Sequence, residues 1–195
     1  MNELNLFSIF ISGMIINNIV LIWFIGLCSF LRVSVSLEAS TGMGIAIIFV
    51  TTISSAVSWI VYNYLLKPYN LEFLKIIVFV LFIALFIQLV AMFIKKNIPG
   101  LLKSSGNYFT LITANCVMLA VAFLQAEYRF NFIQSLVFSL GISCGFALAV
   151  ILFVSIRERL ELAPVPKALK GYPLSFFIAA LMSLAFMGFR GLFGL

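Results

Sequence analysis

Two of the three cysteines in the chain stand beside residues that tend to interrupt helices. Cys28 follows Gly26 in the first apolar stretch, and Cys116 follows Asn115 in the fourth. A lone thiolate is very costly in hydrocarbon, and binding to a metal removes that cost. A buried cysteine is more often a small hydrophobic residue, so both interpretations stay open. The third cysteine, Cys144, lies inside a G-x-x-x-G run, where we expect close helix packing.

Two cysteines cannot complete a four-thiolate iron–sulfur site. A partner protein or a second copy of the chain would have to supply the other two thiolates. The chain has no histidine, which removes the commonest metal ligand and most acid–base enzyme templates. We also find no nucleophile–base pair, no G-x-G-x-x-G and no phosphate loop. Catalysis within this single chain is therefore not expected.

Asparagine and threonine side chains form a cluster inside each of the same two apolar stretches, and they are costly in lipid unless they are paired. Asparagine also disfavours helix interiors, because its side chain competes for backbone hydrogen bonds. We therefore predict broken helices in the first and fourth stretches, which membranes tolerate only where the break is buried in protein or lines a cavity. One interpretation is interhelical hydrogen bonding alone, and the other is a ligand site whose ligands these residues would hydrogen-bond. They are Asn17, Asn18, Thr113 and Asn115.

The elements that position these residues must be membrane helices, because the chain is too poor in charge to cover a soluble surface. It is 64% hydrophobic and 9% charged, whereas a soluble domain carries about 25% charged residues. The N-terminus has Glu3 as its only charged side chain and no cleavage site, so we expect a membrane helix there rather than a signal peptide. Six apolar stretches approach the roughly 20 residues that span a bilayer. They are 4–31, 42–66, 71–94, 108–125, 132–156 and 172–192.

Lys and Arg are unevenly divided between the two sides of this all-α bundle. One side holds eight of them and the other holds four. Since cytoplasmic loops carry the excess, we expect both termini on the outer side of a prokaryotic cytoplasmic membrane. We attribute the net charge of +6 to this topology and to lipid headgroups, not to nucleic acid. The eight are Arg32, Lys95, Lys96, Lys103, Arg157, Arg159, Lys167 and Lys170, and the four are Lys67, Lys75, Arg129 and Arg190.

A faint internal repeat relates the two halves of the chain. The runs 17–21 and 115–119 each read Asn, one residue, two aliphatic residues or Met, then Leu. Each run is followed one helix later by a glycine-rich segment, at 42–44 or 141–145. Three helices per repeat is an odd number, so the second half would sit upside down relative to the first. The expected boundaries are 1–195 for a single membrane domain, about 1–98 for repeat one and about 99–195 for repeat two.

These runs resemble one family of membrane proteins, in order and over essentially the whole chain. The family contains the A-type and E-type proteins of the Rnf complex and the D-type and E-type proteins of the sodium-pumping NADH:quinone reductase. The residues of the first run favour the A type of Rnf. The matching segments include Asn-Asn-Ile-Val-Leu at 17–21, Gly-Leu-Cys at 26–28, Leu-Ile-Thr-Ala-Asn-Cys at 111–116, Asn-Phe-Ile-Gln-Ser at 131–135, Arg-Glu-Arg-Leu at 157–160 and Leu-Met-Ser-Leu-Ala-Phe-Met-Gly-Phe at 181–189.

The resemblance implies a membrane complex that couples electron transfer between ferredoxin and NAD to sodium or proton movement. It also implies pairing with the homologous E-type protein, beside the B-, C-, D- and G-type proteins of the Rnf complex. In the family, one cysteine from each half of each of the paired chains binds a shared [2Fe–2S] cluster, and the matching positions are Cys28 and Cys116. Cys144 matches no family ligand. Ser29 stands where the family pattern has Pro, and the segment 103–110 also departs from it, but both cysteines are intact.

Other functions are also compatible with the pattern. A small secondary transporter would explain the inverted repeat and the broken helices. It would not explain a cysteine beside each polar cluster, and no charged residue lies at the cluster positions to bind a charged substrate. An assembly protein without a cofactor is a blander alternative, and the E-type protein of the sodium-pumping NADH:quinone reductase is the alternative within the family. Iron analysis of the purified complex would separate electron transfer from the transporter and assembly functions.

Overall fold

A computed structural model of the chain describes residues 6–27, 37–67, 75–97, 115–161 and 171–189. Within those ranges the chain forms six α-helices and two short π-helical turns, and it contains no strand. The predicted all-α class is confirmed for the described residues. A helical chain satisfies its backbone hydrogen bonds internally, as a bilayer requires.

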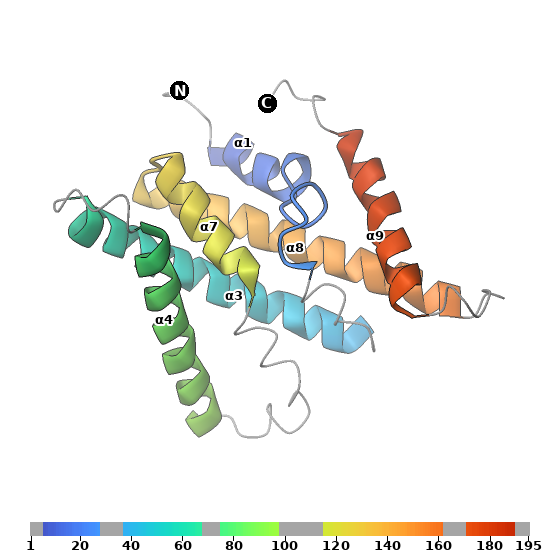
Figure 1. The fold of residues 1–195 in the computed structure, drawn as a ribbon, viewed down its shortest axis with the longest axis horizontal. Helices are drawn as coiled ribbons and strands as arrows, with labels where there is room; N and C mark the ends of the chain where they lie inside the picture. Colours follow the sequence, from blue (N-terminus) through green and yellow to red (C-terminus); the bar gives the residue numbers. More distant parts are fainter. Residues whose placement is uncertain (1–5, 28–36, 68–74, 98–114, 162–170, 190–195) are drawn as a thin grey trace.

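Two long helices form the centre of the molecule (Figure 1). α3 (Leu37–Val61) continues into the π turn η2 (Tyr62–Leu66), and α8 (Phe132–Glu161) lies along it. Over 27 and 29 residues respectively, these are the two described helices long and apolar enough to cross a membrane. Three other described apolar segments have 10–17 residues, which is shorter than the full spans that we predicted: Leu6–Ile16, Cys116–Glu127 and Tyr172–Met187. The remaining helix, Lys75–Asn97, has 23 residues.

Two half-length elements lie against the long pair. α1 (Leu6–Ile11) with the π turn η1 (Ser12–Ile16) packs on α8, whereas α7 (Cys116–Glu127) packs on α3. The first element of each half of the chain therefore packs on the long helix of the other half.

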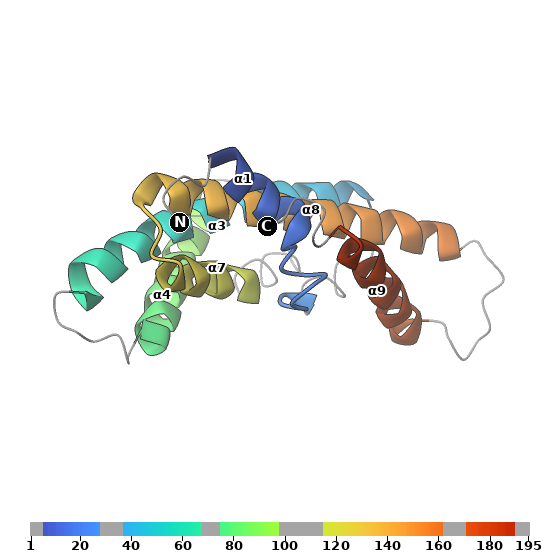
Figure 2. The same cartoon turned by 90° about the horizontal axis from the view of Figure 1, so that it is seen from above.

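The remaining two helices lie at opposite ends of the long pair (Figures 1 and 2). α4 (Lys75–Asn97) contacts α3 and α7, and α9 (Tyr172–Met187) contacts α8 and η1. Each of them thus touches the long helix of its own half and the short element of the other half. The two halves exchange contacts in the same way in both directions.

The first apolar stretch is a broken helix, as predicted. After η1 the chain runs through turns over residues 17–26. The Asn18 Oδ1 atom accepts hydrogen bonds from the backbone N–H groups of Val20 and Leu21, at 3.2 and 3.4 Å. All three residues are buried, so the break lies inside protein, where a membrane tolerates irregular backbone.

The fourth stretch does not form a helix through Asn115, since α7 begins at Cys116 and Asn115 is extended. The part of this stretch before Asn115 lies outside the described residues. Two helices extend beyond the apolar stretches that predicted them: α3 begins at Leu37, five residues before the stretch 42–66, and α8 ends at Glu161, five residues after the stretch 132–156. The prediction followed apolar runs, whereas Glu and Arg are good helix formers and extend these helices beyond them.

Gly141 and Gly145 let the first broken helix approach α8, as the G-x-x-x-G pattern predicted. A Cβ atom on Gly141 would lie 2.6 Å from the backbone oxygen of Phe10, and one on Gly145 would lie 2.5 Å from that of Met14. Both distances are far below van der Waals contact, so a larger residue at either position would push the two backbones apart. Small residues at such crossings are typical of membrane helix packing.

Candidate functional site

Cys116 is the first residue of α7, and its free thiol is exposed at the surface of the chain. Asn115 caps the helix, because its Oδ1 atom accepts a hydrogen bond from the Val117 N–H at 3.1 Å. Asparagine is among the best residues at this position, since it satisfies an N–H that has no partner within the helix. The positive end of the helix dipole therefore lies at Cys116, which suits a negatively charged group.

The broken part of the first stretch touches this helix end. Gly26 has a φ of +91°, and a Cβ atom on it would lie 2.6 Å from Val117 Cγ2 and 3.6 Å from Asn115 Oδ1. Both the positive φ and the close approach require glycine. The segment that leads to Cys28 and the segment that carries Cys116 are thereby brought together. Cys28 itself and Thr113 lie outside the described residues.

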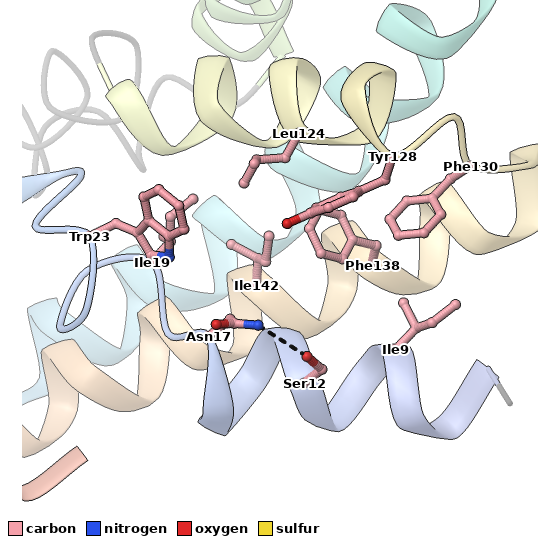
Figure 3. Close-up of a pocket in the computed structure, with 10 residues that line it drawn as sticks. All are labelled: Ile9, Ser12, Asn17, Ile19, Trp23, Leu124, Tyr128, Phe130, Phe138 and Ile142. Atoms are coloured by element: carbon pink, nitrogen blue, oxygen red, sulfur yellow. Dashed lines mark hydrogen bonds between the residues drawn. The ribbon is translucent and has the colours of Figure 1, made fainter. Parts of the chain in front are cut away.

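Asn17 and Asn18 hold the break in place, because the side-chain amide of each residue donates hydrogen bonds within the protein. The Asn18 Nδ2 atom donates to the backbone oxygen of Gly145 at 2.9 Å and to that of Met14 at 3.4 Å. The Asn17 Nδ2 atom donates to Ser12 Oγ at 3.3 Å (Figure 3). At these two positions the structure supports the interpretation as hydrogen bonding within the protein.

The amide of Asn115 differs from those of Asn17 and Asn18. Asn115 is 5% exposed, and its Nδ2 atom has no hydrogen-bond partner. A buried donor without a partner costs about 1–3 kcal/mol, so its persistence calls for an explanation. Two hydroxyls of α3, those of Thr51 and Ser54, share this state among the described residues. Neither of them adjoins a cysteine in the sequence.

The exposed side of Cys116 faces an open apolar recess of about 410 Å³. Trp23, Ile76 and Leu119 are among its lining residues, from the broken segment, α4 and α7. Trp23 and Ile76 are each more than half exposed. The thiol is thus accessible from outside the chain through an apolar surface rather than a charged one.

A second pocket, of about 190 Å³, lies beside the first broken helix (Figure 3). It shares Trp23 and Leu124 with the recess at Cys116, so these two side chains stand between the two spaces. The rest of its lining is largely aromatic and aliphatic, and the Tyr128 hydroxyl points into it (Figure 3). No cysteine or charged side chain is among the described residues that line this pocket, so we assign no redox or proton chemistry to it.

Among the residues that the structure describes, no three His, Cys, Asp or Glu side chains gather closely enough to hold a metal ion. The local chemistry fits an anionic iron–sulfur group, because an accessible thiol, a helix N-terminus and a buried N–H without an acceptor occur together.

Sequence reasoning missed a polar network that joins the three helices around the site. Ser55 Oγ of α3 donates to Gln125 Oε1 of α7 at 2.7 Å, and Ser135 Oγ of α8 donates to the same oxygen. Gln125 Nε2 returns a hydrogen bond to the backbone oxygen of Ser55 at 3.2 Å. A polar residue near the end of an apolar stretch was the available signal. The network fixes α7, and therefore its N-terminus, relative to α3 and α8.

Comparison with known proteins places the chain in a family. The family model described as "Rnf-Nqr subunit, membrane protein" matches residues 6–193. The chain is 50% identical to the A component of the proton-translocating ferredoxin:NAD(+) oxidoreductase complex of Clostridium ljungdahlii, over 95% of this chain and 96% of that protein. It is 44% identical to the A component of the Na(+)-translocating ferredoxin:NAD(+) oxidoreductase complex of Acetobacterium woodii, over 97% of this chain and 98% of that protein.

A third relative is the A component of the ion-translocating oxidoreductase complex of Syntrophotalea carbinolica, at 45% identity over 96% of this chain and 97% of that protein. These relatives match nearly end to end, as the resemblance in the sequence motifs implied. A family model that covers almost every residue agrees with the apolar helices of the structure. The chain therefore belongs to the Rnf-Nqr family of membrane-protein subunits.

Proposed function

We propose that the chain is the A-type membrane component of an Rnf-type complex, an ion-translocating ferredoxin:NAD oxidoreductase. In this proposal it carries electrons within the membrane through a [2Fe–2S] cluster, coupled to sodium or proton transport. The observation that carries the proposal is the close approach of Gly26 to the start of α7, which brings the segment leading to Cys28 near the segment that carries Cys116. The names of the relatives at 44–50% identity support the type of complex.

Cys28 and Cys116 would each supply one thiolate, and the homologous E-type protein would supply the other two. Cys28 is two positions after Gly26 in the sequence. The exposure of Cys116 on an apolar recess supports a site that a partner completes. The cluster would supply a one-electron carrier, while the chain binds it, excludes water and offers N–H groups to its sulfurs.

The lengths of the broken helices support a site near the bilayer midplane. α1 with η1 covers Leu6–Ile16, and α7 has 12 residues. At 1.5 Å per residue, these elements measure about 16 and 18 Å, roughly half of the 30 Å hydrocarbon core. A carrier at their ends would divide the crossing into two shorter electron-transfer steps, which favours tunnelling because its rate falls steeply with distance.

The reciprocal contacts of the two halves support the inverted three-helix repeats. α1 and η1 pack on α8 as α7 packs on α3, and α9 touches η1 as α4 touches α7. Asn18 and Asn115 also cap the chain in the same way in the two halves. With the excess of Lys and Arg inside, we propose an inner-membrane protein whose two termini face outward, as a single domain over 1–195.

A transporter function has less support. The buried polar side chains among the described residues are those of Ser, Thr, Asn and Gln, and none is charged. Charged substrates and proton relays in membranes commonly use buried ionisable residues. Within the family, the relatives reported above are named as A components, which favours the A type over the E-type protein of the quinone reductase.

The test is to purify the chain together with its E-type partner, within the complex with the B-, C-, D- and G-type proteins, and to compare it with the chain alone. We expect a [2Fe–2S] electron paramagnetic resonance (EPR) signal, iron and labile sulfide from the pair of chains. The chain alone should lack all three. A cluster-loaded chain without its partner would refute the shared site, and a pair without iron would refute the cluster. Solute uptake by the chain alone in vesicles would instead favour the transporter.

A further inference from the structure

Asn18 and Asn115 accept the same kind of hydrogen bond from the backbone. Each lies where a helical element is interrupted, and each uses its Oδ1 atom to accept a hydrogen bond from the N–H two residues later. The acceptor distances, 3.2 Å to Val20 N and 3.1 Å to Val117 N, are nearly equal. The oxygen of each amide is thus directed at the backbone, and the NH₂ group of each residue is the part that can donate to other groups.

The NH₂ groups of Asn18 and Asn115 differ in whether they have a hydrogen-bond acceptor. The Asn18 amide braces the first broken helix against α8 by donating to Gly145 O at 2.9 Å. The Asn115 amide has no acceptor, although Asn115 is only 5% exposed. A buried unpaired amide is costly, and a packing role alone would be served by a residue without this donor.

The unpaired amide lies between the two segments that carry the cysteines. The Asn115 side chain is adjacent to Gly26, at 3.6 Å from the position of a Cβ atom there. Asn115 also directly precedes Cys116, whose thiol is exposed while Asn115 is buried. The Asn115 side chain is held by its Oδ1 cap, next to the residue that carries the exposed thiol.

We propose that Asn115 is a positioning residue that donates its Nδ2–H to a sulfur of the cluster bound at Cys116, whereas Asn18 only holds the fold. This inference rests on the proposed [2Fe–2S] function and sharpens it, because it assigns different roles to two residues that accept the same kind of backbone hydrogen bond. Reduction adds one electron and one negative charge to the cluster. An N–H donor stabilises the reduced form more than the oxidised form, so Asn115 raises the reduction potential.

The experiment is an EPR-monitored redox titration of the purified complex with Asn115→Ser and Asn18→Ser. Serine also caps helices well, but its shorter side chain withdraws the amide donor. We expect the Asn115→Ser complex to keep its iron. The equilibrium constant for one-electron reduction of the cluster should fall about tenfold, which corresponds to a reduction potential about 59 mV lower. Asn18→Ser should keep the wild-type potential and lower the thermal midpoint of the complex, because it loses the bond to Gly145.

The outcomes separate this inference from the cluster proposal. Iron-loaded Asn115→Ser with an unchanged or raised potential would overturn the donor role and leave the cluster intact. If Asn115→Ser loads no iron, Asn115→Asp, which keeps the cap and the side-chain shape, carries the test and should titrate at a lower potential. Loss of iron from both variants, with Asn18→Ser still loaded, would assign Asn115 to holding α7 and overturn the inference. Absence of iron from the wild-type pair would instead refute the proposed function.

Discussion

The side-chain amide of Asn18 donates to the backbone oxygen of Gly145, 127 positions later in the chain, at 2.9 Å. Gly145 makes this bond accessible, because the absence of a side chain lets the first broken helix lie against α8. One hydrogen bond thus connects a helix break in the first half with the long helix of the second half. The first helix break is therefore held by the opposite half of the protein.

The three cysteines should respond differently to replacement by serine. Cys28→Ser and Cys116→Ser should each abolish the cluster and the electron transfer, because each would remove one thiolate ligand. Cys144→Ser should keep both, since Cys144 lies on α8 between Gly141 and Gly145 in the packing segment. Iron content and the EPR signal of the purified complex measure the outcome. A normal signal in either of the first two variants would remove that residue from the site, and loss in all three would point to damaged folding.

Glycine-to-alanine replacement should be harmful on α8 and harmless on the exposed face of α3. Gly145→Ala would place a Cβ atom 2.5 Å from the Met14 backbone oxygen, and such overpacking costs about 1–3 kcal/mol. Gly42→Ala is the matched control, because its added Cβ meets no described neighbour within 4 Å. Alanine there should be neutral or stabilising by about 0.5–1 kcal/mol. The midpoint of thermal unfolding of the detergent-solubilised complex measures the effect of each substitution. Equal midpoints for the Gly145→Ala and Gly42→Ala variants would contradict the close packing of η1 on α8.

Gln125→Leu should destabilise the protein and leave the reduction potential of the cluster nearly unchanged. The substitution leaves the hydroxyls of Ser55 and Ser135 without their shared acceptor, at a cost of about 1–3 kcal/mol. Ser155→Ala is the control, since the Ser155 hydroxyl donates to Ile151 O of its own helix, at 2.8 Å. Thermal unfolding and redox titration of the same samples would measure the stability and the reduction potential of both variants. Equal stability of the two variants would argue against the network as a brace for α7.

Reporter fusions test the orientation. Alkaline phosphatase fused after residue 195 should be active, because it needs the outer compartment, and green fluorescent protein at the same place should be dark. The same reporters inserted at 162–170 should give the reverse pattern, since Arg157 and Arg159 mark the side richer in Lys and Arg. A fluorescent C-terminal fusion would refute the outward termini and the three-plus-three inverted arrangement together.

The sequence by itself determined that the chain lies in lipid, that it is helical and that its first apolar stretch is a broken helix. Low charge and long apolar runs require lipid and helices, because a membrane leaves no other way to satisfy the backbone of most of the chain. Asn17 and Asn18 predicted the break because their side chains compete locally for backbone hydrogen bonds. The G-x-x-x-G run likewise predicted a close crossing. These are local properties, which depend on residue type and on spacing within a few turns.

The tertiary structure decided which of these features meet. Nothing local to Gly26 indicates that it lies against Asn115, and nothing local to Asn18 selects Gly145 as its acceptor. The sequence could therefore group Asn17, Asn18 and Asn115 only as equivalents, whereas the structure leaves the amide of Asn115 alone unpaired among them. Pairing of a donor depends on which distant backbone oxygen the fold brings within hydrogen-bonding distance. That is a property of the packed helices, and it separates a residue that braces the fold from one free to serve the site.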